Sequence, residues 1–250
     1  MSNPVILQDT LSAESRAIRM AAMLMENQEV MLSPIERLQD FRDMLLRGAL
    51  PVGSVEFVRL AMRIAGIAEP ANMSYPPQIH SFLKRSIWHC TASAVQGRFF
   101  VKPTTTKCFT GFILDSAALA ESLSEHDAEQ LAEFKSMPAG NLVWVSDVVA
   151  WVSEWRYYIM GATILGSARY DSEGHDDAPS PCLDVVRACV ATMGLGHPYV
   201  LDFGVLANGE TALVEANDAF AIGLYRGALS PRQYLAFLQA RWSFLRGAPL

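Results

Sequence analysis

The Asn208-Gly209 dipeptide separates two stretches rich in apolar residues, 199–206 and 210–216. Asn-Gly is the strongest short signal for a two-residue turn between antiparallel strands, because both residues tolerate a positive φ. We therefore predict that the chain folds back on itself here as a β-hairpin. Such a hairpin fixes part of one sheet and brings side chains of its two strands together.

Three polar residues of this hairpin have the chemistry of metal ligands. Glu215 and Asn217 lie two apart, so they share one face of a strand, and Asp202 precedes Glu215 by thirteen residues, across the turn. Carboxylate and carboxamide oxygens suit a hard cation such as Mg²⁺, and we predict a site formed by all three. The alternatives are that Asp202 caps a turn at Gly204, or that the other two form an edge-strand face or a turn cap.

A lysine at the end of another apolar run completes the pattern. Lys102 follows residues 99–101, and Pro103 ends the run. By itself a lysine in this position is more often a solvated strand end, but it can also hold a phosphate as a point charge. Together with magnesium ligands it indicates a nucleoside triphosphate.

Composition limits the class of protein. With 250 residues, 51% hydrophobic and 18% charged, the chain is typical of a globular protein with a large core. A formal net charge of -6 argues against general affinity for nucleic acid. The four cysteines lack CxxC spacing and are expected to be reduced thiols. We see neither a basic N-terminal signal nor an uncharged stretch long enough for a bilayer, and we expect a cytoplasmic protein without membrane contact.

The first 80 residues are predicted to form a small α/β domain. A strand at 5–7 is followed by helices at 13–27, 34–47 and 55–65, with a turn at 51–54. Ser54 is expected to cap the third helix and Gly66 to end it.

Residues 81–250 are predicted to form a second, strand-rich domain. A hairpin is expected from 92–95 and 98–102, turned at residues 96–97. The remaining elements are listed in chain order: strand 112–114, helices 116–123 and 127–135, strands 141–145, 154–160 and 162–169, a loop at 171–181, helix 183–193, the hairpin above, and helix 231–245.

Six short motifs in this order resemble the ATP-grasp superfamily of carboxylate ligases, and within it a small bacterial and phage group. The similarity covers roughly residues 51–225, and the motifs are LPVGSVEF at 50–57, VKP at 101–103, KCFTG at 107–111, SEWR at 153–156, LDFG at 201–204 and VEAND at 214–218. The resemblance implies an α+β fold in which two α+β subdomains clasp ATP, preceded by the small α/β domain. It also implies activation of a carboxylate as an acyl phosphate, which an amine then attacks.

The resemblance assigns roles to the phosphate-binding residues. Lys102 would contact the α- and β-phosphates, with Lys84 or Arg85 as a second cation. The segment 107–111 would cover the triphosphate and would include Lys107, Thr110 and Gly111, although Thr104 and the two threonines that follow it are stiffer than the usual glycine-rich loop.

The resemblance also assigns the remaining residues. The hinge would consist of Val145, Ser146, Asp147 and Val148, whose backbone reads the adenine edge, with Asp147 near adenine or ribose. Arg156 would meet the γ-phosphate or the acyl phosphate, which makes Arg156 and Lys102 the catalytic pair, and the Asp202, Glu215 and Asn217 set would hold Mg²⁺. A structural alternative for Arg156 is pairing with Glu154 across a sheet.

Three functions follow as hypotheses. The first is an ATP- and Mg²⁺-dependent ligase that joins a small-molecule or peptide carboxylate to an amine. The second is a kinase of the same fold with a non-carboxylate acceptor. The third is a nucleotide-binding or interaction protein without turnover. Retention of the whole polar set favours an active site, because phosphoryl transfer requires several cations and a metal around the phosphates.

Overall fold

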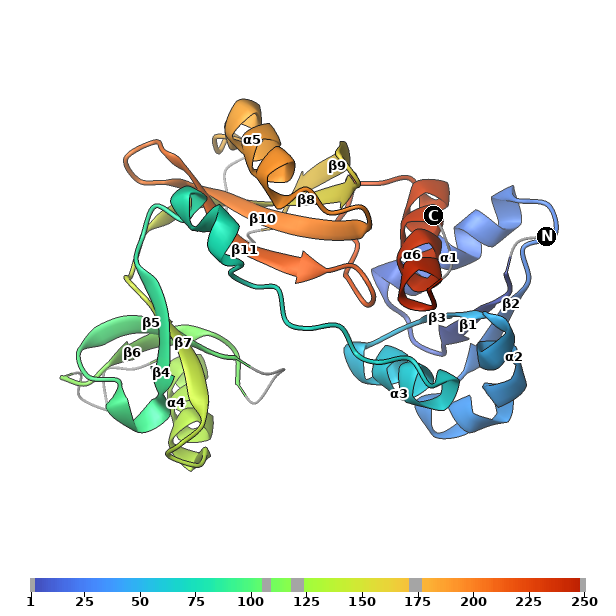
Figure 1. Cartoon of the computed structure of the whole chain (residues 1–250), viewed down its shortest axis with the longest axis horizontal. Helices are drawn as coiled ribbons and strands as arrows, with labels where there is room; N and C mark the ends of the chain where they lie inside the picture. Colours follow the sequence, from blue (N-terminus) through green and yellow to red (C-terminus); the bar gives the residue numbers. More distant parts are fainter. Residues whose placement is uncertain (1–2, 105–108, 118–123, 171–176, 248–250) are drawn as a thin grey trace. The chain divides into compact units, whose positions relative to one another are not determined.

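The structure, a computed structural model, describes residues 3–104, 109–117, 124–170 and 177–247. Two compact units contain these residues (Figure 1). Unit 1 consists of Met1–Phe82 and Val152–Leu250, and unit 2 consists of Leu83–Trp151. The chain therefore leaves unit 1 once and returns to it once.

Unit 1 begins with a three-stranded parallel sheet. Its strands are β1 (Val5–Gln8), β2 (Val30–Ser33) and β3 (Leu50–Val52), in the order β2-β1-β3. Helix α1 (Ala13–Leu24) lies between the first two in sequence, and α3 (Val55–Ala65) follows the third. Parallel strands need such long connections, so the predicted small α/β unit is confirmed.

Parts of this unit differ from the sequence prediction. Pro51 lies inside β3 and not in a turn, which is possible because β3 is an edge strand and can lack a donor on its outer side. Strand β2 was not predicted. The helix expected at 34–47 is a 3₁₀ segment, Ile35–Phe41, continued by α2 (Arg42–Arg47). Helix α3 is as predicted, with the Ser54 hydroxyl accepting from the Phe57 amide at 3.2 Å.

A four-stranded sheet forms the second part of unit 1, in the order β11-β10-β8-β9. Strands β8 (Trp151–Met160) and β9 (Thr163–Arg169) are antiparallel, as are β10 (Pro198–Leu206) and β11 (Thr211–Asp218). The hairpin at Asn208-Gly209 is confirmed, and Gly209 has the positive φ, 84°, that such a turn requires. Helices α5 (Leu183–Met193) and α6 (Pro231–Leu245) match the predicted ranges.

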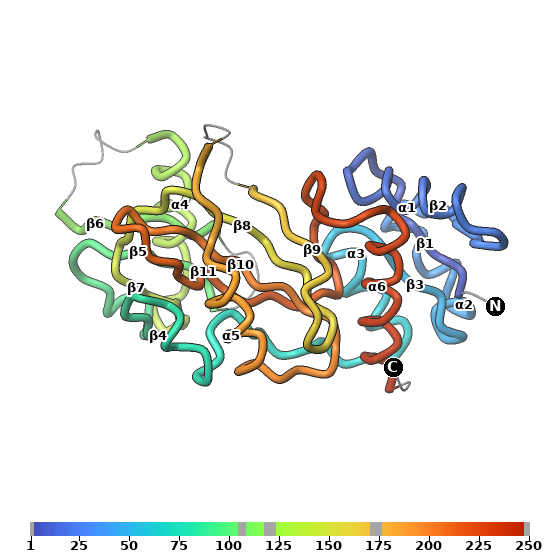
Figure 2. The backbone as a smooth tube through the Cα atoms, turned by 90° about the horizontal axis from the view of Figure 1, so that it is seen from above, coloured from blue at the N-terminus to red at the C-terminus, as the bar shows by residue number. Residues whose placement is uncertain are grey.

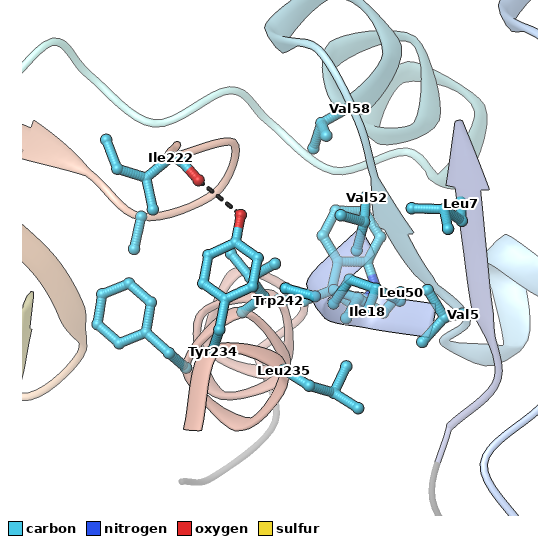
Figure 3. Packing of buried hydrophobic residues seen from close by; sticks show 14 of the residues in the cluster. Val5, Leu7, Ile18, Leu50, Val52, Val58, Ile222, Tyr234, Leu235 and Trp242 are labelled. Carbon is cyan, nitrogen blue, oxygen red and sulfur yellow. Dashed lines mark hydrogen bonds between the residues drawn. The ribbon is translucent and has the colours of Figure 1, made fainter. Parts of the chain in front are cut away.

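One hydrophobic core joins the two parts of unit 1. Helix α6 lies beside α1 (Figures 1 and 2), and its Leu235 and Trp242 pack with Val5 and Leu50 of the first sheet (Figure 3). Val200 of β10 belongs to the same core. The sequence-based division into domains 1–80 and 81–250 stays a prediction, and in the structure the two stretches share buried apolar surface.

Unit 2 is a four-stranded antiparallel sheet in the order β4-β7-β5-β6. Its strands are β4 (Ile87–Thr91), β5 (Arg98–Pro103), β6 (Phe112–Asp115) and β7 (Leu142–Ser146). Helix α4 (Glu125–Ser136) contributes Phe134 to a separate core that includes Val101 and Val143.

The hairpin predicted at 92–102 was wrong. Ala92–Ala94 is a short 3₁₀ turn, β4 pairs with β7, and β5 pairs with β6 and β7. Gly97 does have a positive φ, 107°, but it turns the chain between strands that are not neighbours. The turn signal was local, whereas the strand partner was chosen by packing across the sheet.

Several predictions fall outside the described residues, wholly or in part. They are the helix at 116–123, the loop at 171–181, of which residues 177–181 are described, and the position of Lys107. Within the described ranges, no helix combines the length and the apolar character that crossing a bilayer would require.

Candidate functional site

Four of the predicted site residues meet in unit 1. Arg156 lies on β8, Asp202 on β10, and Glu215 and Asn217 on β11. In the hairpin register Asp202 is opposite Glu215, and Val200 is opposite Asn217. A register shift follows Asp202, and a bulge of this kind re-aims side chains next to functional sites.

Arg156 and Asp202 form a buried bidentate ion pair. Arg156 Nε donates to Asp202 Oδ1 at 2.8 Å, and Nη2 donates to Oδ2 at 2.7 Å. Asp202 is 1% exposed and Arg156 is 9% exposed. Burial by itself would lower the pKa of the Arg156 guanidinium, but the hydrogen bonds and charge of Asp202 raise that pKa above its ordinary value. The guanidinium is therefore a permanent cation with one edge fixed.

Asn217 connects the two carboxylates of the hairpin. Its Nδ2 donates to Glu215 Oε1 at 2.9 Å and lies 3.4 Å from Asp202 Oδ2. Two carboxylates opposite each other on paired strands repel, and a divalent cation bound between their oxygens would remove that repulsion. Rotation of the Asn217 amide would supply a third oxygen. The donor set therefore fits Mg²⁺.

Two tyrosine rings flank the guanidinium, and sequence reasoning missed both. Tyr170 and Tyr225 stack with centroids 5.0 Å apart and planes 15° from parallel. The Arg156 Cζ lies 5.7 Å from the Tyr170 centroid and 5.0 Å from that of Tyr225. Arginine over a tyrosine ring is a favourable cation–π arrangement. Tyr225 is far from Arg156 in sequence, and no spacing pattern connects the two.

Glu154 has a different partner from the one considered in the sequence. Its Oε2 accepts a hydrogen bond from the Tyr170 hydroxyl at 2.7 Å, whereas the ion pair of Arg156 is with Asp202. Burial, and then the charges of Asp202 and Glu154, raise the pKa of Tyr170 far above its ordinary value, so the phenol stays protonated and donates to Glu154.

The predicted phosphate lysine lies in unit 2. Lys102 is on β5 opposite Trp144 of β7, and its neighbour Val101 is buried in the unit 2 core. Because strand residues alternate, Lys102 points to the face opposite that core. Gly111 lies against this face, where a Cβ atom would clash with the Phe100 ring and approach Lys102 Cβ to 3.3 Å. Thr110 is exposed, and its amide donates to Gln130 Oε1 at 2.5 Å.

The other predicted cations of unit 2 lie just after its first residue. Lys84 has a φ of 53°, the left-handed region that few non-glycine residues adopt. The Arg85 guanidinium donates to the Leu83 carbonyl at 3.1 Å and lies 5.3 Å from the Trp151 ring centroid.

The predicted hinge follows strand β7. Val145 is buried in the core of unit 2, and Ser146 ends the strand. Asp147 is tied to Ser86 in both directions: its amide donates to the Ser86 carbonyl at 3.2 Å, and its Oδ2 accepts from the Ser86 amide at 2.9 Å. Val148 follows, and the chain enters unit 1 at Val152. The Asp147 carboxylate thus has a backbone partner, and its contact with a nucleotide stays a prediction.

Comparison with known proteins identifies relatives of this arrangement. A family model described as an ATP-grasp domain, the second family of one clade of that superfamily, matches residues 82–237. Curated proteins gave no match. Among solved structures, the D-alanine–D-alanine ligase from Bacillus anthracis is similar, with 10% identity, 99% of each chain covered and a TM-score of 0.51.

Two further solved structures are similar at low identity. D-cycloserine synthetase DcsG shares 18% identity with 94% of this chain and 99% of that chain covered, and a TM-score of 0.54. The ATP-grasp ligase PsnB, complexed with a phosphomimetic variant of minimal precursor, Mg and ADP, shares 12% identity over 97% of this chain and 98% of that chain, with a TM-score of 0.50. At these identities the likeness establishes a common fold.

Proposed function

Because this chain belongs to that family of ATP-grasp domains, we propose that it is an ATP- and Mg²⁺-dependent ligase that joins a carboxylate to an amine. The observation that carries the proposal is the cluster on three strands of unit 1, in which Arg156, Asp202, Glu215 and Asn217 combine one fixed guanidinium with oxygen donors that fit a divalent metal. Three solved relatives of the same fold are named as ligases or as a synthetase, which supports the reaction class.

The proposed reaction has two steps. In the first, a carboxylate oxygen of the substrate attacks the γ-phosphorus of ATP, the bond to the bridging oxygen of ADP breaks, and an acyl phosphate forms. In the second, the amine nitrogen attacks the acyl carbon, phosphate leaves, and the amine loses a proton to give an amide. Both steps move negative charge between oxygens, so fixed cations are the main requirement.

The residues of the chain divide this work. The bonds of Arg156 to Asp202 use Nε and Nη2, so the Nη1 group takes no part in that pair and is proposed to meet the transferring phosphoryl group. Lys102 is proposed to bind the α- and β-phosphates. Bound Mg²⁺, held by Asp202, Glu215 and Asn217, would neutralise phosphate charge. The names of the relatives favour small-molecule or peptide substrates, and we propose that class for this chain.

The reaction class is tested by ATP turnover against a panel of amino acids, small carboxylic acids and short peptides, with products identified by mass spectrometry. We expect ADP, phosphate and an amide. ADP together with a stable phosphorylated compound would identify a kinase instead, and absence of turnover with every pair would favour a nucleotide-binding protein.

The metal site is tested separately by calorimetry. Wild-type protein should bind ATP more tightly with Mg²⁺ than without it, and Glu215→Ala should lose most of that difference, because a hard cation loses one of its oxygen ligands. Glu210→Ala is a matched control, since Glu210 is an exposed acidic residue at the turn of the same hairpin. Equal metal-dependent tightening in wild type and Glu215→Ala would remove Glu215 from the site.

A further inference from the structure

The backbone of residues 222–225, between β11 and α6, is held by side chains from three other parts of unit 1. Tyr234 of α6 donates its hydroxyl to the Ile222 carbonyl at 2.7 Å (Figure 3). Glu14 of α1 accepts from the Leu224 amide at 2.8 Å. Tyr158 of β8 provides the remaining contacts of this segment. These bonds give an irregular connection a defined path.

Tyr158 holds the segment through both functions of one hydroxyl. The hydroxyl donates to the Gly223 carbonyl at 2.7 Å and accepts from the Tyr225 amide at 3.1 Å. Tyr158 is 0% exposed, so water is not expected to replace either bond if the hydroxyl is removed. Burial raises the pKa of Tyr158 to about 12, and the phenol therefore remains a neutral donor and acceptor at physiological pH.

The residue fixed at the end of this segment is one of the two rings at the proposed catalytic arginine. Tyr225 stacks on Tyr170, and its ring is the closer of the two to the Arg156 guanidinium, at 5.0 Å. Asp202 fixes one edge of that guanidinium, whereas an edge contact alone allows the plane to tilt. A ring packed against the guanidinium limits this tilt.

We propose that Tyr158 is a positioning residue for Arg156: by fixing the backbone at Gly223 and Tyr225, its hydroxyl holds the Tyr225 ring against the guanidinium and thereby sets the orientation of that group. The inference rests on the proposed function for its kinetic consequence, but the structural link from Tyr158 to Arg156 is independent of the reaction. Displacement of a catalytic group by about 1 Å can cost on the order of 100-fold in rate.

The test compares two single-hydroxyl deletions on adjacent residues of β8. Tyr158→Phe removes the proposed positioning hydroxyl. Tyr157→Phe is the matched control, because Tyr157 is also buried but packs its ring against Phe203, 6.0 Å between centroids, on the other face of the strand. Tyr225→Leu removes the ring itself and leaves the hydroxyl of Tyr158 in place.

Three measurements are made on each protein: hydrogen exchange of the Leu224 and Tyr225 amides, the NMR shift of the Arg156 Nε–H group, and turnover with ATP affinity. Tyr158→Phe should speed exchange at Tyr225, shift the Arg156 resonance through the changed ring current, and lower kcat about 10- to 100-fold with ATP affinity within about twofold. Tyr225→Leu should shift the same resonance and lower kcat equally, and Tyr157→Phe should match wild type.

An unchanged Arg156 resonance in both Tyr158→Phe and Tyr225→Leu would overturn the proposal, even if exchange at the segment rises. So would an equal kcat loss in the Tyr157→Phe control, which would show a general effect of hydroxyl deletion. If Tyr158→Phe does not fold, Tyr225→Leu decides alone. If wild-type protein turns over no substrate pair, the proposed function fails, and the resonance measurement still decides whether Tyr158 positions Arg156.

Discussion

Arg156 is the residue on which structure and proposed chemistry depend most. Its guanidinium neutralises the buried Asp202 carboxylate, and it is also the proposed contact for the transferring phosphoryl group. A substitution at Arg156 therefore changes two properties at once. Removing one partner of a buried ion pair is strongly destabilising, because it leaves the other charge buried without compensation.

We predict that Arg156→Met lowers the free energy of unfolding by about 3–5 kcal/mol. Arg156→Met combined with Asp202→Asn should recover a large part of that loss, because the uncompensated charge is gone. Urea unfolding of the two variants, with Asp202→Asn alone as control, measures this. If the double variant is no more stable than Arg156→Met, uncompensated charge is not the cause of the destabilisation.

Lys102 is the contrasting case, a partly exposed lysine on β5 whose side chain faces away from the unit 2 core. Lys102→Ala should keep the melting temperature of the nucleotide-free protein, since a lysine at a strand end supports little core. It should lose most of the stabilisation that ATP gives wild type. Thermal melts with and without ATP and Mg²⁺ test this, with Lys135→Ala as control. A Lys102→Ala protein that ATP stabilises as much as wild type would contradict the assignment.

At the scale of elements, the β10–β11 hairpin determines the proposed metal site. Its register places Asp202 opposite Glu215, and a slip of one residue would move a ligand to the other face of the sheet. The turn at Asn208-Gly209 fixes this register. Gly209 has a φ of 84° with open space around the position of a Cβ atom, so only the backbone conformation requires glycine here.

We predict that Gly209→Ala destabilises the protein by about 1–2 kcal/mol, the cost of placing an L-residue in the left-handed region. Gly196→Ala is the control, because a Cβ atom at Gly196 also meets no atom within 4 Å and no positive φ is involved. Denaturant unfolding distinguishes the two. Equal stability of both variants would mean that the turn relaxes without cost.

At the scale of the whole molecule, the N-terminal sheet and the C-terminal helix depend on one another. Leu235 and Trp242 of α6 are buried in the same core as Val5 and Leu50, which lie more than 180 residues earlier in the chain. Unit 2 has its own core, around Val101 and Phe134. The architecture is therefore set by long-range packing in unit 1 and by a separate, local sheet in unit 2.

This predicts the result of removing residues 1–80. The shortened chain should not fold as a soluble monomer, because the apolar face of α6 would lose the surface that covers it. Expression, size-exclusion chromatography and circular dichroism of residues 81–250, beside the full chain, provide the measurement. A monomeric product with a cooperative melt would show that the stretch 81–250 is an independent domain.

The sequence by itself determined features that depend on short-range chemistry. The Asn208-Gly209 turn, the Ser54 and Ser230 caps and the range of α5 follow from backbone preferences of individual residues, and the structure confirms them. The grouping of Asp202 with Glu215 and Asn217 also follows, because a hairpin register is local.

Only the tertiary structure decided features that join distant segments. Pairing of β4 with β7 replaced the predicted local hairpin because the partner is chosen by burial across the whole sheet. Pro51 could lie in a strand because that strand is at an edge, a position that no short pattern reveals. Tyr158 and Tyr225 reach Arg156 through an irregular segment held by α1, β8 and α6, so their role depends on packing that no spacing in the sequence encodes.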